Sequence, residues 1–204
     1  MNFKKLSSIL FLLVFFVSCN EYEKLMGPIL KIKLADSNPN PIFDGEAEPP
    51  IPNRFENDRT ILGIDSNNNG IRDDVDIWIN RTALDYNERM AMRQYARAEQ
   101  DELRVCSLEL KDETSKVVTE SMNSSYCLNS LSDHKRKVRD RTEFEVDKLT
   151  FSSKDRIDCR GFYDRNSFVA GGGDISKPYL NCKFKIQNLE SEIKAYKNFG
   201  SHSR

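Results

Sequence analysis

The chain has 204 residues, of which 38% are hydrophobic and 31% are charged. This apolar content is enough for one core of ordinary size, so we expect a single folded domain. The 31 Lys and Arg residues nearly balance the 32 Asp and Glu residues, for a net charge of −1. A nucleic-acid-binding protein needs a concentrated positive surface to displace counterions from phosphates, and this balance argues against that class.

Residues 1–18 have the layout of an export signal. Lys4 and Lys5 precede an unbroken apolar run, Ile9–Val17. As a helix this run rises only about 14 Å, at roughly 1.5 Å per residue, whereas a bilayer core requires about 20 residues. The pattern therefore predicts a signal peptide that is removed on export, and not a permanent membrane span.

The end of this segment, Phe16-Val17-Ser18-Cys19, resembles the lipobox of bacterial lipoproteins, with Phe16 where the family usually has Leu. The resemblance implies cleavage before Cys19, lipidation of this cysteine, and attachment to a membrane of the cell envelope, the outer membrane being favoured over the inner. The alternative is an ordinary signal peptide cleaved nearby, but no A-x-A-like site supports it.

Residues 19–58 contain six of the seven prolines. Because proline removes an amide donor and restricts its predecessor, we expect an extended, flexible tether here, with a short ordered piece at residues 29–34. A tether of this length would hold the domain about 35 Å from the membrane on average. The globular domain is then expected over residues 59–200.

The segment Asp65–Asp76 has the oxygen spacing of a twelve-residue calcium loop. Side-chain oxygens recur at positions one, three and five, and Gly70 stands at position six, where the chain must turn sharply. A hard cation needs six or more oxygens around one point. The expected ligands of a structural calcium ion are Asp65, Asn67, Asn69, Ile71 through its backbone carbonyl, Asp73 and Asp76.

Over about a dozen residues this loop resembles those of dockerin-type EF-hand relatives and of thrombospondin type 3 repeats. With the amphipathic helix after it, the loop is also similar to uncharacterised bacterial envelope proteins, which brings no known activity. Dockerins carry two such loops and this chain has one, so the resemblance implies no cohesin partner. The alternative is a solvated turn in which Asp73 caps the next helix without a metal.

Apolar residues at spacings of three and four predict helices after the loop. Val75, Trp78 and Ile79 would share one face of the first helix. Further helices are expected at residues 83–110, 113–127, 131–149 and 188–198.

Near the C-terminus the apolar period changes to two. Leu180, Cys182, Phe184 and Ile186 alternate with polar residues, as in a half-buried strand. A partner strand around residues 157–163, with Gly171–Gly173 between them, would complete a hairpin. The expected fold class is therefore mainly α: a helical domain with a small C-terminal β-hairpin.

With Cys19 lipidated, four cysteines remain, and in an exported protein they indicate two disulfides with three possible connectivities. Pairing of sequence neighbours, Cys106 with Cys127 and Cys159 with Cys182, would close loops of about twenty residues. If the first two lie on helices joined by a turn near Lys111, they are unequally distant from it, and a different pairing is the alternative that remains open. A four-thiolate zinc site would require closer spacing.

The sequence shows no catalytic Ser/His/Asp or Cys/His arrangement, and it has only two histidines. We therefore expect a non-enzymatic, calcium-stabilised binding or structural module of the cell envelope. Its expected partners are the bilayer, through acylated Cys19, and an envelope protein or glycan. The alternative is an envelope hydrolase with a structural calcium ion and a cleft of Asp and Glu residues.

Overall fold

The computed structural model describes residues 21–36, 38, 40–166 and 176–202. The predicted signal peptide, Cys19 and Gly171–Gly173 lie outside these residues. In chain order the described elements are a helix at residues 21–35 (the N-terminal helix), β1 (Ile42–Phe43), β2 (Glu46–Ala47), α2 (Arg54–Asn57), α3 (Asp73–Thr82), α4 (Tyr86–Ser107), the 3₁₀ turn η1 (Lys111–Glu113), α5 (Thr114–Arg136), α6 (Arg141–Thr150), α7 (Lys154–Asn166), the 3₁₀ turn η2 (Pro178–Asn181) and α8 (Leu189–His202). The predicted fold class, mainly α, is confirmed.

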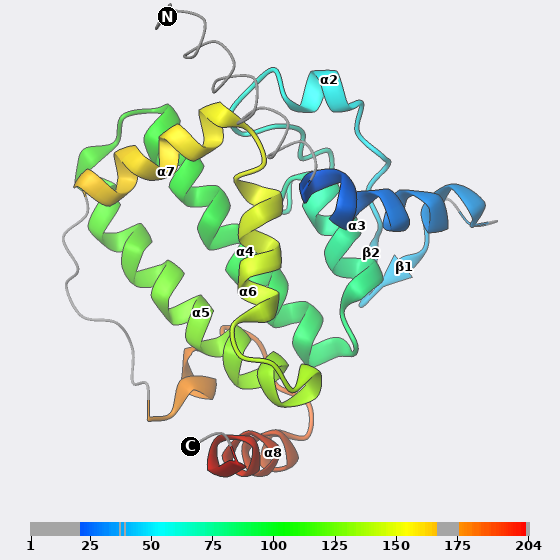
Figure 1. Ribbon diagram of the computed structural model, residues 1–204, viewed down its shortest axis with the longest axis vertical. Coiled ribbons are helices and arrows are strands. Elements are labelled where there is room, and N and C mark those ends of the chain that lie inside the picture. The colour runs from blue at the N-terminus through cyan, green and yellow to red at the C-terminus, as the bar shows by residue number, and fades with distance from the viewer. Residues whose placement is uncertain (1–20, 37, 39, 167–175, 203–204) are drawn as a thin grey trace, which may run out of the picture.

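The long helices α4 and α5 lie antiparallel at the centre of the molecule, and α6 packs against both (Figure 1). Helix α7 crosses one end of this pair, near α2, while α8 lies at the opposite end. The main core joins α3, α4, α5 and α6 to the N-terminal helix through buried apolar side chains. No helix in the described ranges is long and apolar enough to cross a bilayer.

The extended tether predicted for residues 19–58 is not what the structure has from residue 21 onward. Tyr22, Met26 and Ile29 follow one face of the N-terminal helix and are buried in the main core. Pro28 stands on the exposed face, where the missing amide donor costs one helical hydrogen bond but no packing. The apolar spacing of three and four residues at these positions favours a helix in spite of the proline content of the region.

The β-hairpin lies at residues 42–47 and not near the C-terminus. Its two strands pair antiparallel, and Asp44-Gly45 forms the turn with φ of 53° and 89°. Positive φ at both central residues is the requirement of the two-residue hairpin turn, and Asp-Gly is among its preferred sequences. Arg81 then fastens the hairpin region to α3 by hydrogen bonds to Glu48 at 2.7 and 2.8 Å.

The two strands predicted at residues 157–163 and 180–186 do not form. The first falls in α7, and the second is η2 followed by an irregular segment whose Cys182, Phe184 and Ile186 pack on the main core. Amide side chains of α4 take the place of a partner strand. Gln94 accepts from Lys183 N and donates to Asn181 O, so alternating burial arises without a sheet.

The other predicted helices form, but they begin and end at different residues from those predicted. The helices predicted at residues 113–127 and 131–149 are instead α5 and α6. The break between them lies at Lys137 and Asp140, whose φ of 54° and 53° no α-helix accommodates. Val75, Trp78 and Ile79 are all buried on α3, as predicted.

Two disulfides form, as predicted, but the neighbour pairing is wrong. Cys106 pairs with Cys159, joining α4 to α7, and Cys127 pairs with Cys182, joining α5 to the segment after η2. The Cα–Cα distances are 5.6 and 5.0 Å. Because α4 and α5 are antiparallel, Cys106 near the end of one helix lies far from Cys127 in the second half of the other. Cys106 and Cys127 therefore each pair with a later segment of the chain that packs against their own helix.

Candidate functional site

The loop at residues 65–76 folds back on itself around Gly70, which has φ of 81°. Asp65 Oδ2 accepts a hydrogen bond from Gly70 N at 2.9 Å, and its Oδ1 accepts one from Asn69 N at 3.2 Å. Asn67 Oδ1 also accepts from Asn69 N, at 3.3 Å. The side-chain oxygens of positions one and three thus meet at the backbone amide of position five, with glycine supplying the left-handed backbone that the reversal requires.

Asp73 closes the loop from the first turn of α3. Its Oδ1 accepts a hydrogen bond from Ser66 N at 2.9 Å, so the two ends of the loop meet. Burial raises the pKa of the Asp73 carboxyl, and the negative charges of Asp65 and Asp74 raise it further, against the hydrogen bonds from Ser66. A cation placed between Asp65 and Asp73 would relieve this repulsion.

The carboxylate of Asp76, at position twelve, accepts hydrogen bonds from side chains of the protein. Arg93 Nε donates to Asp76 Oδ1 at 3.2 Å, and Asn69 Nδ2 donates to its Oδ2 at 3.0 Å. Arg97 Nε donates to the carbonyl oxygen of Asn69 at 2.8 Å. Two guanidinium groups of α4 therefore border the predicted metal position, and Asp76 is paired with one of them.

Ile71, at position seven, links the loop to the main core. Its side chain is buried in that core, and its amide donates to Asn69 Oδ1 at 2.9 Å. In the part of the chain that the structure describes, no group of three or more His, Cys, Asp or Glu side chains is placed to hold a metal ion. A cation in this loop would therefore take oxygens from Asn67, Asn69 and backbone carbonyls besides those of Asp65 and Asp73.

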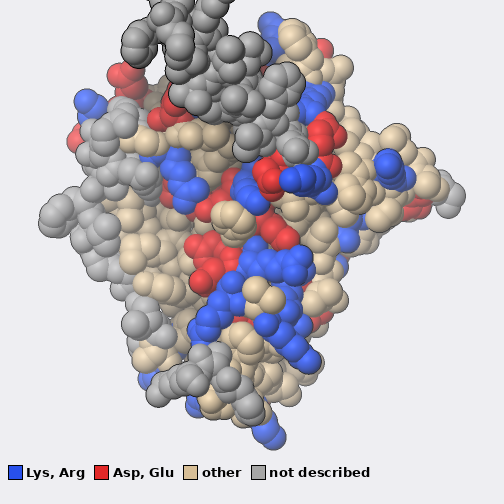
Figure 2. Space-filling view, in the orientation of Figure 1, with Lys and Arg blue, Asp and Glu red and all other residues tan. Residues whose placement is uncertain are grey.

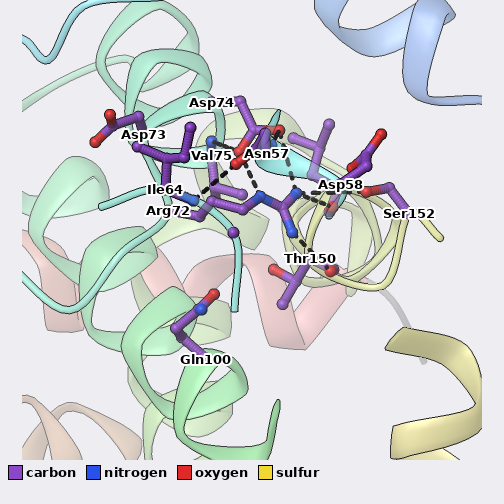
Figure 3. A network of polar contacts seen from close by, with 12 residues as sticks. Asn57, Asp58, Ile64, Arg72, Asp73, Asp74, Val75, Gln100, Thr150 and Ser152 are labelled. Atoms are coloured by element: carbon purple, nitrogen blue, oxygen red, sulfur yellow. Dashed lines mark hydrogen bonds and ion pairs between the residues drawn. The ribbon is translucent and has the colours of Figure 1, made fainter. Parts of the chain in front are cut away.

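Next to the loop lies a buried set of polar groups that we call the Arg72 network: Tyr22, Asn57, Arg72, Asp74 and Arg156. Figure 3 shows Asn57, Arg72 and Asp74 of this network. Arg72 Nε donates to Asp74 Oδ1 at 2.5 Å, and Arg72 Nη2 donates to the Leu149 carbonyl at 2.6 Å. Arg72 Nη1 donates to the Thr150 carbonyl at 3.2 Å. One guanidinium thus satisfies the carboxylate beside the loop and the C-terminal carbonyls of α6.

Asp74 is almost completely enclosed by donors. Tyr22 Oη and Asn57 Nδ2 donate to its Oδ2 at 2.9 and 3.1 Å. Burial would raise the pKa of this carboxyl, but the charge and hydrogen bonds of Arg72, with the Tyr22 hydrogen bond, outweigh burial and lower it. Asp73 points away from this network in Figure 3, so the two adjacent aspartates serve different sites.

Gly63 belongs to this arrangement for a steric reason. Its φ is 73°, and a Cβ at this position would overlap the Arg72 side chain and lie 2.7 Å from Asn57 Oδ1. The loop can therefore pass over the Arg72 network only with glycine at residue 63.

A second charged group, which we call the Glu99 cluster, lies between α4, α6 and α7. Its members are the buried Tyr95, Glu99 and Glu102 and the partly exposed Asp147 and Arg160. Burial raises the pKa of Glu99 well above its ordinary value, and the charges of Glu102 and Asp147 add to this. Glu99 Oε1 accepts from Ser121 Oγ at 2.7 Å, while Oε2 has no hydrogen-bond partner among the described residues. The Glu99 cluster therefore contains three carboxyl groups and one basic side chain.

Two open clefts lie elsewhere on the described surface. One, of about 280 Å³, is bordered by residues of α4 and α5 and by Lys183 and Phe184. The other, of about 540 Å³, lies beside α8 and is bordered by Arg139, Tyr179 and Tyr196. Neither of these two clefts is lined by Glu99 or Glu102.

Arg72, Arg93 and Arg97 are important to the site, and the sequence interpretation missed them. A signal existed for two of the three, because Arg93 and Arg97 are four residues apart and so share one face of a predicted helix. No local pattern indicated that Arg72 would be buried, since its partners lie up to 80 residues away.

Comparison of the chain with protein-family models, with curated proteins and with solved structures found no match. The function proposed below therefore rests on the sequence and the structure of this chain.

Proposed function

We propose that the protein is an exported lipoprotein, acylated at Cys19, whose helical domain is a non-enzymatic binding or structural module of the bacterial cell envelope. One observation carries the proposal: Cys106, Cys127, Cys159 and Cys182 pair with one another in two disulfides. Disulfides persist in oxidising extracytoplasmic compartments. Cys19 is the one cysteine that these pairs leave over, and it stands where the lipobox resemblance expects the acylated residue.

Mass spectrometry of the N-terminal peptide from the native membrane fraction tests this proposal. The expected result is a peptide that begins at Cys19 and carries a diacylglycerol. The Cys19→Ser variant should keep its leader or appear unanchored, since no thiol remains to accept lipid. A native protein whose peptide still contains residues 1–18, or whose Cys19 is unmodified, would overturn the proposal.

We propose further that the loop at residues 65–76 binds one calcium ion as a structural element. The support is that the side-chain oxygens of Asp65 and Asn67 meet at the Asn69 amide, and that the carboxylates of Asp65 and Asp73 are close enough to repel one another. Bound calcium would neutralise this repulsion and join the loop to the start of α3. With Asp76 paired to Arg93, fewer carboxylates remain for the ion, which favours the weak affinity of extracellular modules, about 10⁻⁴ to 10⁻³ M.

Thermal unfolding with 10 mM calcium and with a chelator tests the metal site. Binding in this affinity range stabilises the fold by roughly 1.4 to 2.7 kcal/mol. Asp65→Ala should abolish the calcium-dependent rise in Tm, whereas Asp155→Ala, an exposed acid on α7, should retain it. A wild-type Tm that calcium does not change, or a rise that survives in Asp65→Ala, would contradict the site.

The hydrolase alternative has one observation in its favour, the buried Glu99 and Glu102 pair with the raised pKa of Glu99. A perturbed carboxyl is typical of catalytic acids, but structural charge clusters perturb pKa values as well. A general acid must reach its substrate, and neither cleft of the described structure is lined by these residues. The module is therefore the function that the geometry supports better.

A further inference from the structure

The first turn of the N-terminal helix lies next to the proposed lipid anchor. Cys19 is two residues before Glu21, and two residues span at most about 7 Å. Tyr22 is buried and donates to Asp74 at 2.9 Å, while Glu21 pairs with Lys148 of α6 at 2.8 Å. The folded domain therefore begins almost directly after the residue proposed to be acylated. This part of the domain surface must then lie close to the bilayer.

Two exposed phenylalanines flank that first turn. Phe144 of α6 is 58% exposed, and the Lys148 ammonium that pairs with Glu21 lies 4.3 Å from the centre of its ring. Phe55 of α2 is 77% exposed and follows Arg54, whose guanidinium pairs with Glu23. Large aromatic rings in water are unfavourable, and membrane interfaces are where such rings are commonly buried.

The charges around these rings do not oppose a membrane. The hydrogen bonds from Lys148 and Lys24 lower the pKa of Glu21 to about 2, so its carboxylate is ionised and paired at neutral pH. Glu23 is likewise paired, with Arg54. The long stems of lysine and arginine allow their charged ends to reach lipid phosphates while the rings lie deeper. Figure 2 shows that the face it draws carries both acidic and basic side chains. The net charge of the chain is only −1, so long-range charge attraction contributes little to orienting the domain.

We propose that the surface formed by Glu21, Arg54, Phe55, Phe144 and Lys148 (the anchor face) lies against the bilayer that holds acylated Cys19, and that the rings of Phe55 and Phe144 enter its interface. This inference rests on the proposed lipidation. In this arrangement the domain contacts the membrane directly, and the flexible tether that the sequence predicted does not hold it about 35 Å away.

The N-terminal helix offers a matched control. Leu34 is 75% exposed, nearly as much as Phe55, but it is thirteen residues beyond Glu21 on the same helix. At 1.5 Å per residue this places it about 20 Å from the first turn. Leu34 should therefore remain in water when the anchor face meets lipid.

The test uses the lipidated full-length protein in phosphatidylcholine vesicles that contain brominated lipid, which quenches tryptophan on contact. Phe55→Trp, Phe144→Trp and Leu34→Trp each add one reporter to the native Trp78, which is buried and common to all three. Brominated lipid should quench the added emission of Phe55→Trp and Phe144→Trp at least about twofold more than that of Leu34→Trp, since interfacial groups lie about 5–10 Å deep.

The outcomes separate this inference from the proposal on which it rests. If mass spectrometry of the same sample shows acylated Cys19 but the three reporters are quenched equally or not at all, the anchor face is wrong and the lipoprotein proposal stands. Protection of the Phe55→Trp and Phe144→Trp reporters from aqueous iodide without quenching by brominated lipid would mean that a second copy of the chain covers these rings, and it would overturn the inference. An unacylated Cys19 overturns both.

Discussion

The Arg72 network and the Glu99 cluster are two buried charge groups in one small domain, and they are built in opposite ways. In the network every oxygen of Asp74 has a donor, and two arginines offset the acid. In the Glu99 cluster three carboxyl groups share Arg160, and one oxygen of Glu99 has no partner among the described residues. Asp74 and Glu99 are equally buried, each 1% exposed, so the number of partners decides whether the carboxyl is ionised.

Helix α7 connects the two groups. Arg156 reaches the Arg72 network through the carbonyl of Asn57 at 2.7 Å, and Arg160, one turn later, pairs with Asp147 at 3.0 Å. The disulfide from Cys159 to Cys106 fixes α7 on α4 between these two arginines. Burial and the nearby charge of Arg72 lower the pKa of Arg156 to about 10, which still leaves it charged at neutral pH. The contrast between the two charge groups can be tested by replacing Arg72, the Cys106–Cys159 disulfide and Glu99 in turn.

The largest effect is expected from Arg72→Met. This change leaves Asp74 buried without its guanidinium and removes the donors to the last carbonyls of α6, so the free energy of unfolding should fall by about 3–5 kcal/mol. Arg104→Met, which removes a surface arginine paired with Asp101 and Glu113, should cost at most about 1 kcal/mol. Urea unfolding at pH 7 measures both. Equal losses would mean that the Arg72 network contributes no more than a surface ion pair.

The second largest loss of stability is expected from removing the Cys106–Cys159 disulfide, which fixes α7 between the two charge groups. Replacing Cys106 and Cys159 together by serine frees a loop of 53 residues and should lower stability by about 4 kcal/mol through the unfolded state. The matched control replaces Cys127 and Cys182, which are 55 residues apart and predict nearly the same entropic loss. A larger loss for the first pair would measure what α7 contributes to both charge groups. A larger loss for the second pair would contradict the linking role of α7.

The smallest effect is expected from Glu99→Gln, and it depends on pH. Because burial and neighbouring acids raise the pKa of Glu99 in the folded state, its stabilising contribution is present below the ordinary value of 4.5 and is lost as pH rises through the raised pKa. Glutamine cannot ionise, so the variant should gain stability relative to wild type as pH increases from about 5 to 9, by less than either loss above. Urea unfolding across this range measures the difference.

The surface variant Glu113→Gln, which removes one carboxylate of the Arg104 ion pair, is the control for the replacement of a glutamate by glutamine as such. If Glu99→Gln runs parallel to wild type at all pH values, Glu99 is ionised in the folded protein. The two buried charge groups would then be alike, and the comparison would fail.

Part of the candidate site could be predicted from sequence because it is local. The spacing of Asp65, Asn67 and Asn69 around Gly70 specifies a turn whose own backbone amides fill its oxygens, and these contacts span at most five residues. The three-and-four spacing of Val75, Trp78 and Ile79 likewise needs only the helix that contains it. The N-terminal helix and the Asp44-Gly45 hairpin had local signals too, and they were missed because proline content was given more weight.

The remainder depended on contacts between distant segments. Nothing near Asp76 in the sequence indicates that Arg93 will pair with it, and nothing near Cys106 selects Cys159 over Cys127. The alternation around Phe184 predicted a strand, yet amide side chains of α4 supply the hydrogen bonds that a second strand would have given. A periodic pattern reports which side of a segment is buried, but not which element buries it.

The amino-acid sequence by itself therefore determined the helical class, the turn at residues 65–76 and the presence of two disulfides, because each follows from short-range spacing or from residue counts. Only the tertiary structure decided the disulfide connectivity, the burial of Arg72 with Asp74, and the packing of residues 21–35 on the core. These features form when helices far apart in the chain meet, and the free energy of a buried charge or a cross-link depends on the partner that arrives there.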